Sequence, residues 1–120
     1  MKLKYDKDTA VLNTVVQTAK LFAEPNRVRI LALLWRDAPL CVCEICDTLQ
    51  LSQPLVSRHL KQMRQVGAVQ TEAAGKWMLY SLDKEHELYV CYETLLENIA
   101  DSLPKRVQCQ KREHKLEVKN

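Results

Sequence analysis

Residues 40–67 constrain the fold most. Pro39, Pro54 and Gly67 limit the helices that this segment can form to two short ones. Pro39 interrupts the helical pattern, so residues 40–51 can form only a short helix. Ser52 is a natural N-cap, and Pro54 is tolerated in the first turn of the next helix, which stops at about residue 66 before Gly67. Two short helices joined by a tight turn predict a helix-turn-helix.

The segments on either side predict further helices and a hairpin. Apolar residues recur at helical spacing over residues 8–23, and a more apolar helix begins at Pro25 and runs to about residue 36. Past Gly67 the period changes towards two in AVQTEA and WMLYSL, which predicts a β-hairpin with its turn at residues 74–76. Asp83 can cap a last helix that ends at Pro104. The predicted fold class is mainly α, a winged helix-turn-helix of order α-α-α-α-β-β-α.

Length and composition favour one globular domain. A chain of 120 residues is long enough for a single core, and 47% hydrophobic with 28% charged residues exclude a disordered or fibrous protein. We expect one domain over residues 1–104, and a polar, mobile C-terminal tail over residues 105–120. No stretch approaches the roughly 20 apolar residues of a membrane helix, and the start lacks the features of a signal peptide. We therefore expect a cytoplasmic protein with no membrane partner.

The distribution of charge points to nucleic acid. The net charge of +3 is small, but residues 48–71 hold no acidic side chain and three cations. The helix predicted over residues 52–66 has an apolar side that would face the core and a polar side that would face solvent. The cation at the hairpin tip is placed to contact a nucleic-acid phosphate. His59 adjoins the core side, where it suits packing as well as a DNA contact. The candidate DNA-binding residues are Gln53, Ser57, Arg58, His59, Lys61 and Lys76.

One such domain makes few contacts, so we expect a homodimer on double-stranded DNA, with residues 1–104 serving both DNA binding and dimerisation. The last helix carries an apolar stripe, and the first helix carries a similar one. Both stripes suit a dimer interface, and both suit the core of one chain equally well. The stripe of the last helix consists of Leu88, Cys91, Tyr92, Leu95, Leu96, Ile99 and Leu103.

Three cysteines in the run LCVCEIC are the most specific chemical signal. On a regular helix Cys43 and Cys46 share a face, whereas Cys41 points about 200 degrees away from Cys43. The three sulfurs can converge if Cys41 lies at the unwound start of the helix and a ligand distorts the first turn. Three soft thiolates suit a trigonal ion such as As(III) or Sb(III), whereas structural zinc takes four ligands. We therefore expect As(III) or Sb(III) as the ligand of this site, without an organic cofactor.

Other roles for the five cysteines stay open. The clustered thiols also suit small buried residues, and Cys43 with Cys46 has the C-x-x-C spacing of a redox switch. Cys91 lies on the apolar stripe, which favours packing. Cys109 falls in the polar tail, where it suits an exposed thiol or an auxiliary ligand.

The segments LFAEPNRVRILALL, LCVCEIC, LSQPLVSRHLKQMRQVGAV and GKWMLYSL together closely resemble the ArsR/SmtB family of metal-responsive bacterial repressors, in particular its arsenical resistance branch. The resemblance covers about residues 19–103. It implies a homodimeric winged-helix repressor that leaves the operator of an arsenic resistance operon when As(III) or Sb(III) binds. By this resemblance Cys41, Cys43 and Cys46 match the inducer ligands, and residues 52–61 match the recognition helix.

The sequence departs from other branches of that family. Zinc sensors use an Asp-x-His pair and a later His and Glu on the last helix, whereas here Asp83 and His86 are three residues apart and Glu97 replaces the later His. Cadmium and lead sensors add an N-terminal cysteine, and residues 1–40 contain none. Some arsenic repressors carry thiols on the C-terminal helix, which again leaves Cys91 and Cys109 open.

Two rival functions differ in what they predict. A repressor of the same fold that senses oxidants through a disulfide would regain DNA binding when a reductant is added. A small thiol oxidoreductase using Cys43 and Cys46 would turn over disulfides and would not bind DNA. An enzyme is not expected, because the histidines lie far apart, no glycine loop for phosphate occurs, and no cysteine adjoins a plausible base.

Overall fold

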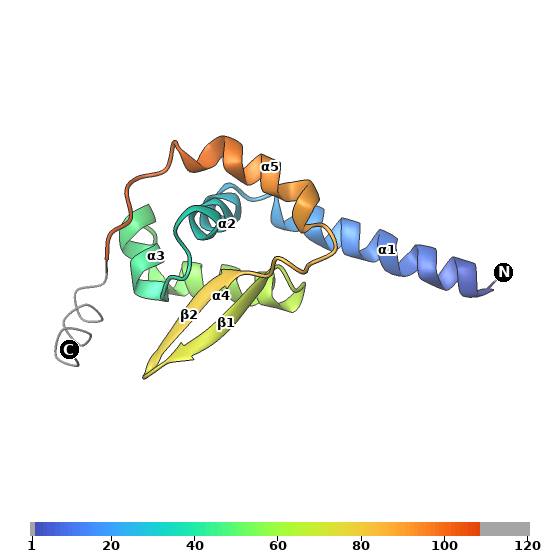
Figure 1. Cartoon of the computed structure of the whole chain (residues 1–120), viewed down its shortest axis with the longest axis horizontal. Coiled ribbons are helices and arrows are strands. Elements are labelled where there is room, and N and C mark those ends of the chain that lie inside the picture. Colours follow the sequence, from blue (N-terminus) through green and yellow to red (C-terminus); the bar gives the residue numbers. More distant parts are fainter. Residues whose placement is uncertain (1, 109–120) are drawn as a thin grey trace.

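The computed structural model describes residues 2–108, and it describes side chains from residue 9 onward. Within this range the predicted order of elements is confirmed (Figure 1). The helices are α1 (Lys2–Leu21), α2 (Pro25–Asp37), α3 (Val42–Leu49), α4 (Gln53–Gln65) and α5 (Tyr89–Ala100), and the strands are β1 (Val69–Ala74) and β2 (Trp77–Leu82). Together they form a winged helix-turn-helix with a helix added at each end.

Helix α2 is the centre of the core. Its first turn is fixed as predicted by Pro25, and the Glu24 carboxylate accepts a hydrogen bond from the Arg27 N–H at 2.9 Å. The next two turns are apolar on nearly every face, which suits a helix with neighbours on several sides: α5, β2 and α3 all contact it. Its fully buried residues are Ile30, Leu31, Ala32, Leu33 and Leu34.

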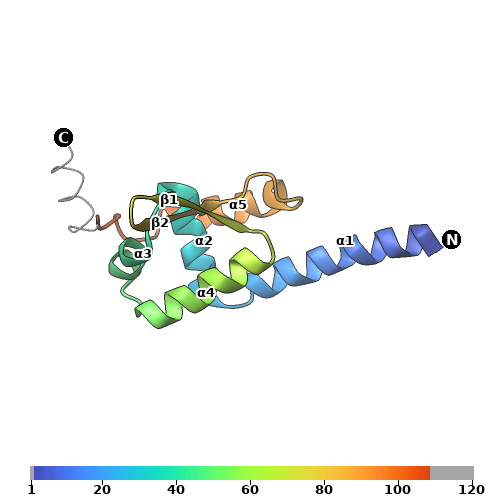
Figure 2. The same ribbon diagram turned by 90° about the horizontal axis from the view of Figure 1, so that it is seen from below.

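Helices α3 and α4 meet in a tight turn. Gln50 ends α3 in the left-handed conformation (φ 58, ψ 47), although it is not a glycine. Ser52 stands at the N-cap of α4 with extended backbone, and the chain then packs the predicted core side of α4, Val56, Leu60 and Met63, into the domain. Figure 2 shows α4 crossing the underside of the molecule.

The hairpin pairs in register from Val69 with Leu82 to Ala74 with Trp77, so its turn has two residues. Gly75 takes φ 65 there, a conformation that such a turn demands and that glycine adopts without strain. The backbone of Leu40, just before α3, pairs with Tyr80 on the free side of β2. The wing is therefore joined to the chain that enters the helix-turn-helix.

The start of α5 differs from the prediction. Asp83 does not cap this helix: its carboxylate accepts a hydrogen bond from the Glu85 N–H at 2.9 Å, and turns occupy the chain up to the helix start at Tyr89. His86 also takes part in these turns, because its Nδ1 accepts from the Leu88 N–H at 3.1 Å. Short side-chain contacts within this segment outcompete an earlier helix start.

The apolar stripe of α5 is divided between two faces. Tyr92 and Leu96 are buried against the core, whereas Leu95 is 54% exposed. Cys91 is exposed as well, so its interpretation as a packing residue is wrong within this chain. The helix has more apolar residues than one face can hold, and the surplus points outward.

Helix α1 extends away from the rest of the molecule (Figure 1). Of its side chains from residue 9 onward, only Thr18 and Leu21, near its end, are buried. Val11, Leu12, Val15 and Val16 are 40% to 61% exposed. The helix runs from Lys2 to Leu21, shifted towards the N-terminus from the predicted residues 8–23.

The chain after α5 does not leave the domain at residue 104. Residues 105–108, assigned to a polar and mobile tail from the sequence, lie against α3, where Arg106 and Val107 make hydrogen bonds. Residues 109–120, including Cys109, lie outside the described residues. None of the described helices combines the length and the apolar character needed to span a membrane.

Candidate functional site

The three clustered cysteines occupy the start of α3. Cys41 is the N-cap residue, with extended backbone (φ −87, ψ 166), and Cys43 and Cys46 lie within the helix. This is the unwound position that the sequence suggested for Cys41. Cys41 is buried, whereas Cys43 and Cys46 are half-buried.

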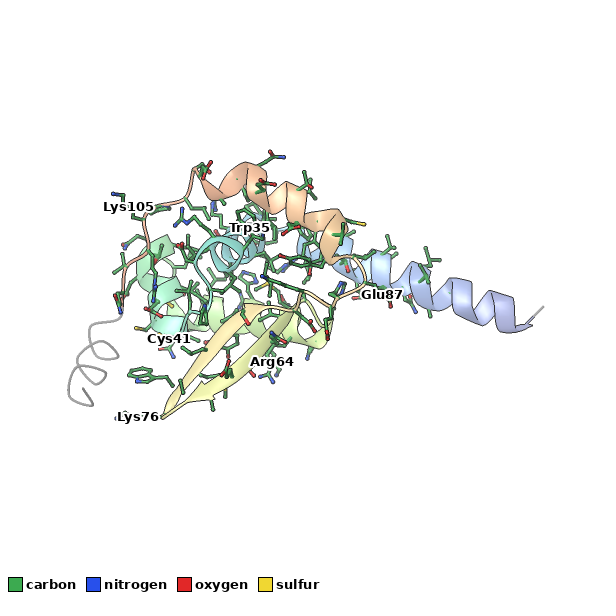
Figure 3. All side chains as sticks on the ribbon, in the orientation of Figure 1. Trp35, Cys41, Arg64, Lys76, Glu87 and Lys105 are labelled. Carbon is green, nitrogen blue, oxygen red and sulfur yellow. The ribbon has the colours of Figure 1, made fainter. Side chains whose placement is uncertain are left out.

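All three thiol residues line one cavity of about 390 Å³. Its wall also includes Gln53, the first residue of α4, and Trp77 and Met78, the first two residues of β2. Figure 3 shows Cys41 on the side of the molecule that faces the hairpin. A ligand on these thiols would therefore contact the helix-turn-helix and the wing together.

The thiols are not yet assembled into a site for an ion. Among the residues whose side chains are described, no group of three His, Cys, Asp or Glu side chains is close enough to hold a metal. Cys41 precedes the helix, whereas Cys43 and Cys46 follow its regular path.

A buried carboxylate stabilises this first turn. Glu44 is fully buried, and its Oε1 accepts a hydrogen bond from the backbone N–H of Cys41 at 3.1 Å. Its Oε2 lies 2.9 Å from Nη2 of Arg106. Glu44 thus occupies the third position of a capping box that begins at Cys41.

The same surroundings favour the protonated forms of Cys41 and Cys46. Burial raises the pKa of Cys41, and the nearby Glu44 charge raises it further. Burial also raises the pKa of Cys46, with a further contribution from Asp47. Because metal ions bind the thiolate, binding at these two cysteines must release their protons.

The predicted DNA-binding residues share one exposed surface, with one exception. Gln53, Ser57, Arg58 and Lys61 are exposed along α4, and Lys76 is exposed at the tip of the hairpin. His59 is instead buried, with its Nε2 3.4 Å from Oε2 of Glu24. The interpretation of His59 as a DNA contact is therefore corrected, because a side chain on the core side of α4 cannot reach a ligand on the exposed side.

A hollow between α4 and β2 adds two residues that the sequence did not single out as contacts. Arg64 and Tyr80 line it, together with Ser57, Lys61 and Gln65, around about 340 Å³. The helical period places positions 57, 61 and 64 on one face, so Arg64 could have been found from the sequence. Tyr80 could not, because its position depends on how the wing packs beside α4.

Comparison with known proteins places the chain in a family. Residues 24–71 match the model of the family described as bacterial regulatory protein, arsR family. The arsenic resistance transcriptional regulator ArsR1 of Pseudomonas putida is 37% identical over 83 residues, which cover 69% of this chain and 63% of the relative. A solved structure of the transcriptional regulator HlyU from Vibrio vulnificus is 32% identical with a TM-score of 0.63, covering 81% of this chain and 97% of that one. The chain belongs to the arsR family.

The fold of this arsR-family chain also matches a homodimeric winged helix-turn-helix DNA-binding domain, Mb0332 from Mycobacterium bovis. The TM-score is 0.66 at 24% identity, over 80% of this chain and 86% of that one. The chain spans under two thirds of the length of ArsR1. The range that matches the arsR family holds the three clustered cysteines and all of α4, whereas Lys76 and Trp77 of the wing lie beyond it.

Proposed function

We propose that this protein is a DNA-binding repressor of an arsenic resistance operon, released from its operator when As(III) or Sb(III) binds Cys41, Cys43 and Cys46. One observation carries the proposal: the three thiol residues open onto a single cavity that also borders the first residue of α4. The 37% identity to ArsR1, an arsenic resistance transcriptional regulator, supports the arsenical resistance branch of the family. The cytoplasm suits this function, since thiols stay reduced there.

The proposed DNA surface combines α4 with the wing. Gln53, Ser57, Arg58 and Lys61 would face the major groove, where such side chains bind base edges and phosphates. Lys76 would reach the backbone or the minor groove beside the wing. The hollow lined by Arg64 and Tyr80 has the cationic and hydroxyl groups that suit a phosphate.

The proposed assembly is a homodimer formed by α1 and α5. Both helices expose large apolar side chains, which the described chain does not cover itself: Val11, Leu12, Val15, Val16, Val90 and Leu95. Two protomers joined there would present two α4 helices to successive half-sites. The proposed DNA-binding and dimerisation domain then extends from α1 through α5, together with residues 105–108 that lie against α3.

Release would follow from assembly of the thiol site. Drawing Cys41 towards Cys43 and Cys46 must distort the start of α3, and α4 follows α3 after a short turn. A ligand that binds the distorted form better shifts the population towards it. DNA affinity falls if that form misplaces Gln53 or the wing.

The test is fluorescence anisotropy of the reduced protein on the DNA upstream of its own gene, with a non-thiol reductant present. Arsenite, zinc and cadmium are added in separate titrations. Release by arsenite alone supports the repressor and its inducer together. Binding without release by arsenite contradicts the proposed inducer, and absence of binding contradicts the repressor.

A further inference from the structure

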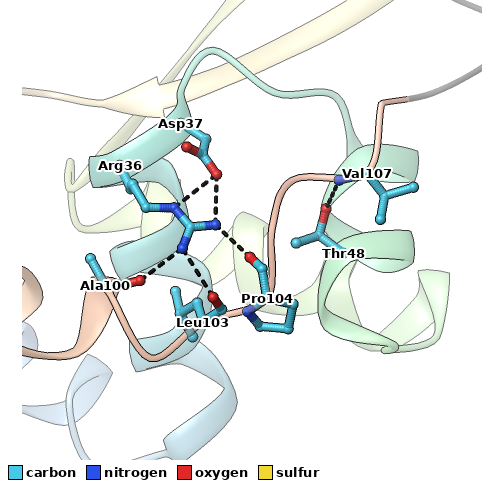
Figure 4. Close-up of polar contacts among 7 residues, drawn as sticks. All are labelled: Arg36, Asp37, Thr48, Ala100, Leu103, Pro104 and Val107. Atoms are coloured by element: carbon cyan, nitrogen blue, oxygen red, sulfur yellow. Dashed lines mark hydrogen bonds and ion pairs between the residues drawn. The ribbon is translucent and has the colours of Figure 1, made fainter.

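Residues 105–108, here named the C-terminal strap, run along α3 and contact both of its ends. Near the start of α3, Nη2 of Arg106 pairs with Oε2 of Glu44 at 2.9 Å. Near its end, the Val107 N–H donates to Oγ1 of Thr48 at 2.8 Å (Figure 4). Both partners on α3, Glu44 and Thr48, are buried. The strap therefore supplies hydrogen-bond partners to side chains that are shielded from water.

The strap starts from a fixed point. The guanidinium of Arg36 on α2 donates to the carbonyl oxygens of Ala100 at 2.8 Å, Leu103 at 3.1 Å and Pro104 at 2.5 Å. Its position is set in turn by the Asp37 carboxylate at 2.8 Å. Figure 4 shows these contacts next to the bond between Thr48 and Val107. The end of α5 is thereby held to α2 before the chain reaches α3.

Glu44 connects the strap to the thiol site. One carboxylate oxygen of Glu44 accepts a hydrogen bond from the backbone N–H of Cys41, and the other pairs with Arg106. The Arg106 side chain is 34% exposed. Any movement of Cys41 relative to the first turn of α3 strains this arrangement. Such movement is what three-thiol binding demands, since the thiols are unassembled in the described chain.

We propose that the C-terminal strap holds α3 in its ligand-free form and that Arg106 thereby sets the concentration of trivalent metalloid needed for release. This inference rests on the proposed function. A contact present only in the ligand-free form raises the ligand concentration that shifts the population. Arg106 is thus a positioning residue, which acts on the thiols through Glu44.

The experiment compares the full-length Arg106→Ala and Thr48→Val variants, each of which removes one strap contact, with Lys105→Ala, which changes an exposed strap residue. Hydrogen exchange of the α3 amides from residue 45 to 49 is measured first, without metalloid. We expect about threefold to tenfold faster exchange in both strap variants, the range that loss of one charge-assisted or buried hydrogen bond gives. Lys105→Ala should match the wild type, and Arg106→Lys should restore most of the protection.

Arsenite titration of the protein bound to operator DNA then tests the threshold. We expect half-release of Arg106→Ala and Thr48→Val at arsenite concentrations lower than wild type by a similar factor. Unchanged exchange in both variants overturns the strap, whether or not arsenite acts as inducer. If exchange is faster but half-release needs the same or a higher arsenite concentration, the strap does not set the arsenite concentration needed for release. If wild-type protein is not released by arsenite at all, the proposed function fails, and that result is distinct from either of these.

Discussion

Leu40 and Tyr80 exchange two backbone hydrogen bonds, from the Leu40 N–H to the Tyr80 oxygen at 3.0 Å and from the Tyr80 N–H to the Leu40 oxygen at 2.7 Å. Leu40 directly precedes Cys41, and Tyr80 belongs to the wing and to the hollow beside α4. A two-stranded hairpin is marginal alone, so this pairing helps to fix the angle of the wing. Movement of Cys41 would therefore reach both elements of the proposed DNA surface, the wing through Leu40 and α4 through the shared cavity.

Replacing Cys41, Cys43 or Cys46 singly by Ser should leave operator binding intact and abolish release by arsenite. Serine is a good N-cap residue and close in size to cysteine, so each variant keeps the start of α3. A hydroxyl is a poor ligand for a soft ion, which leaves two sulfurs for a site that needs three. Anisotropy with added arsenite measures the loss.

Cys91→Ser is the matched control for these variants. This thiol is exposed on α5, away from the cavity that the clustered cysteines line. Release of the control should equal that of wild type. Normal release from all three cluster variants would remove the cluster from the mechanism.

Arg58→Ala should weaken operator binding and flatten its dependence on salt. Arg58 is exposed on α4, and loss of one phosphate contact lowers the slope of log K against log salt by about one. Lys84→Ala removes an exposed cation outside the helix-turn-helix and the wing, so its slope should equal that of wild type. A wild-type slope for Arg58→Ala would mean that Arg58 does not touch phosphate.

Leu95→Asp should convert the proposed dimer to monomers and lower operator affinity. Leu95 is 54% exposed in one chain, so the carboxylate costs the monomer little, whereas a dimer through α5 would bury it without a partner. Sedimentation velocity measures the state of association. Lys84→Asp also introduces a carboxylate, while removing a cation, at an exposed position outside α1 and α5, and this control should stay dimeric. An equally stable Leu95→Asp dimer would place the interface elsewhere.

Tyr92 should make the fold sensitive to alkaline pH. Burial raises the pKa of Tyr92 from 10.0 to about 12. Between these values the unfolded chain loses the proton that the folded chain retains, so stability falls as the pH rises through this window. Tyr92→Phe should reduce that loss in urea unfolding, while stability at neutral pH changes little, because the Tyr92 hydroxyl has no hydrogen-bond partner among the described residues. An alkaline loss equal to that of wild type would exclude Tyr92 as its source.

The helix-turn-helix was predictable because its signals are local. The breaker at Pro39, the N-cap at Ser52 and the stop at Gly67 act on residues close in the chain, and the structure places α3 and α4 between them. The change from helical to alternating spacing of apolar residues past Gly67 likewise predicted the hairpin, which β1 and β2 form. The spacing of the cysteines showed that three sulfurs could converge only if Cys41 stood at an unwound helix start, and the extended backbone of Cys41 meets that condition.

The amino-acid sequence by itself determined the order of the elements, the core side of α4 and the clustering of three thiols, since these depend on periodicity and on neighbours a few residues apart. Only the tertiary structure decided that His59 is buried, that Cys91 is exposed, and that Gln53 and Trp77 border the thiol cavity. It also decided that Arg106 reaches Glu44 across 62 positions of the chain. Such relationships depend on how whole elements pack, and no local pattern of residues specifies that packing.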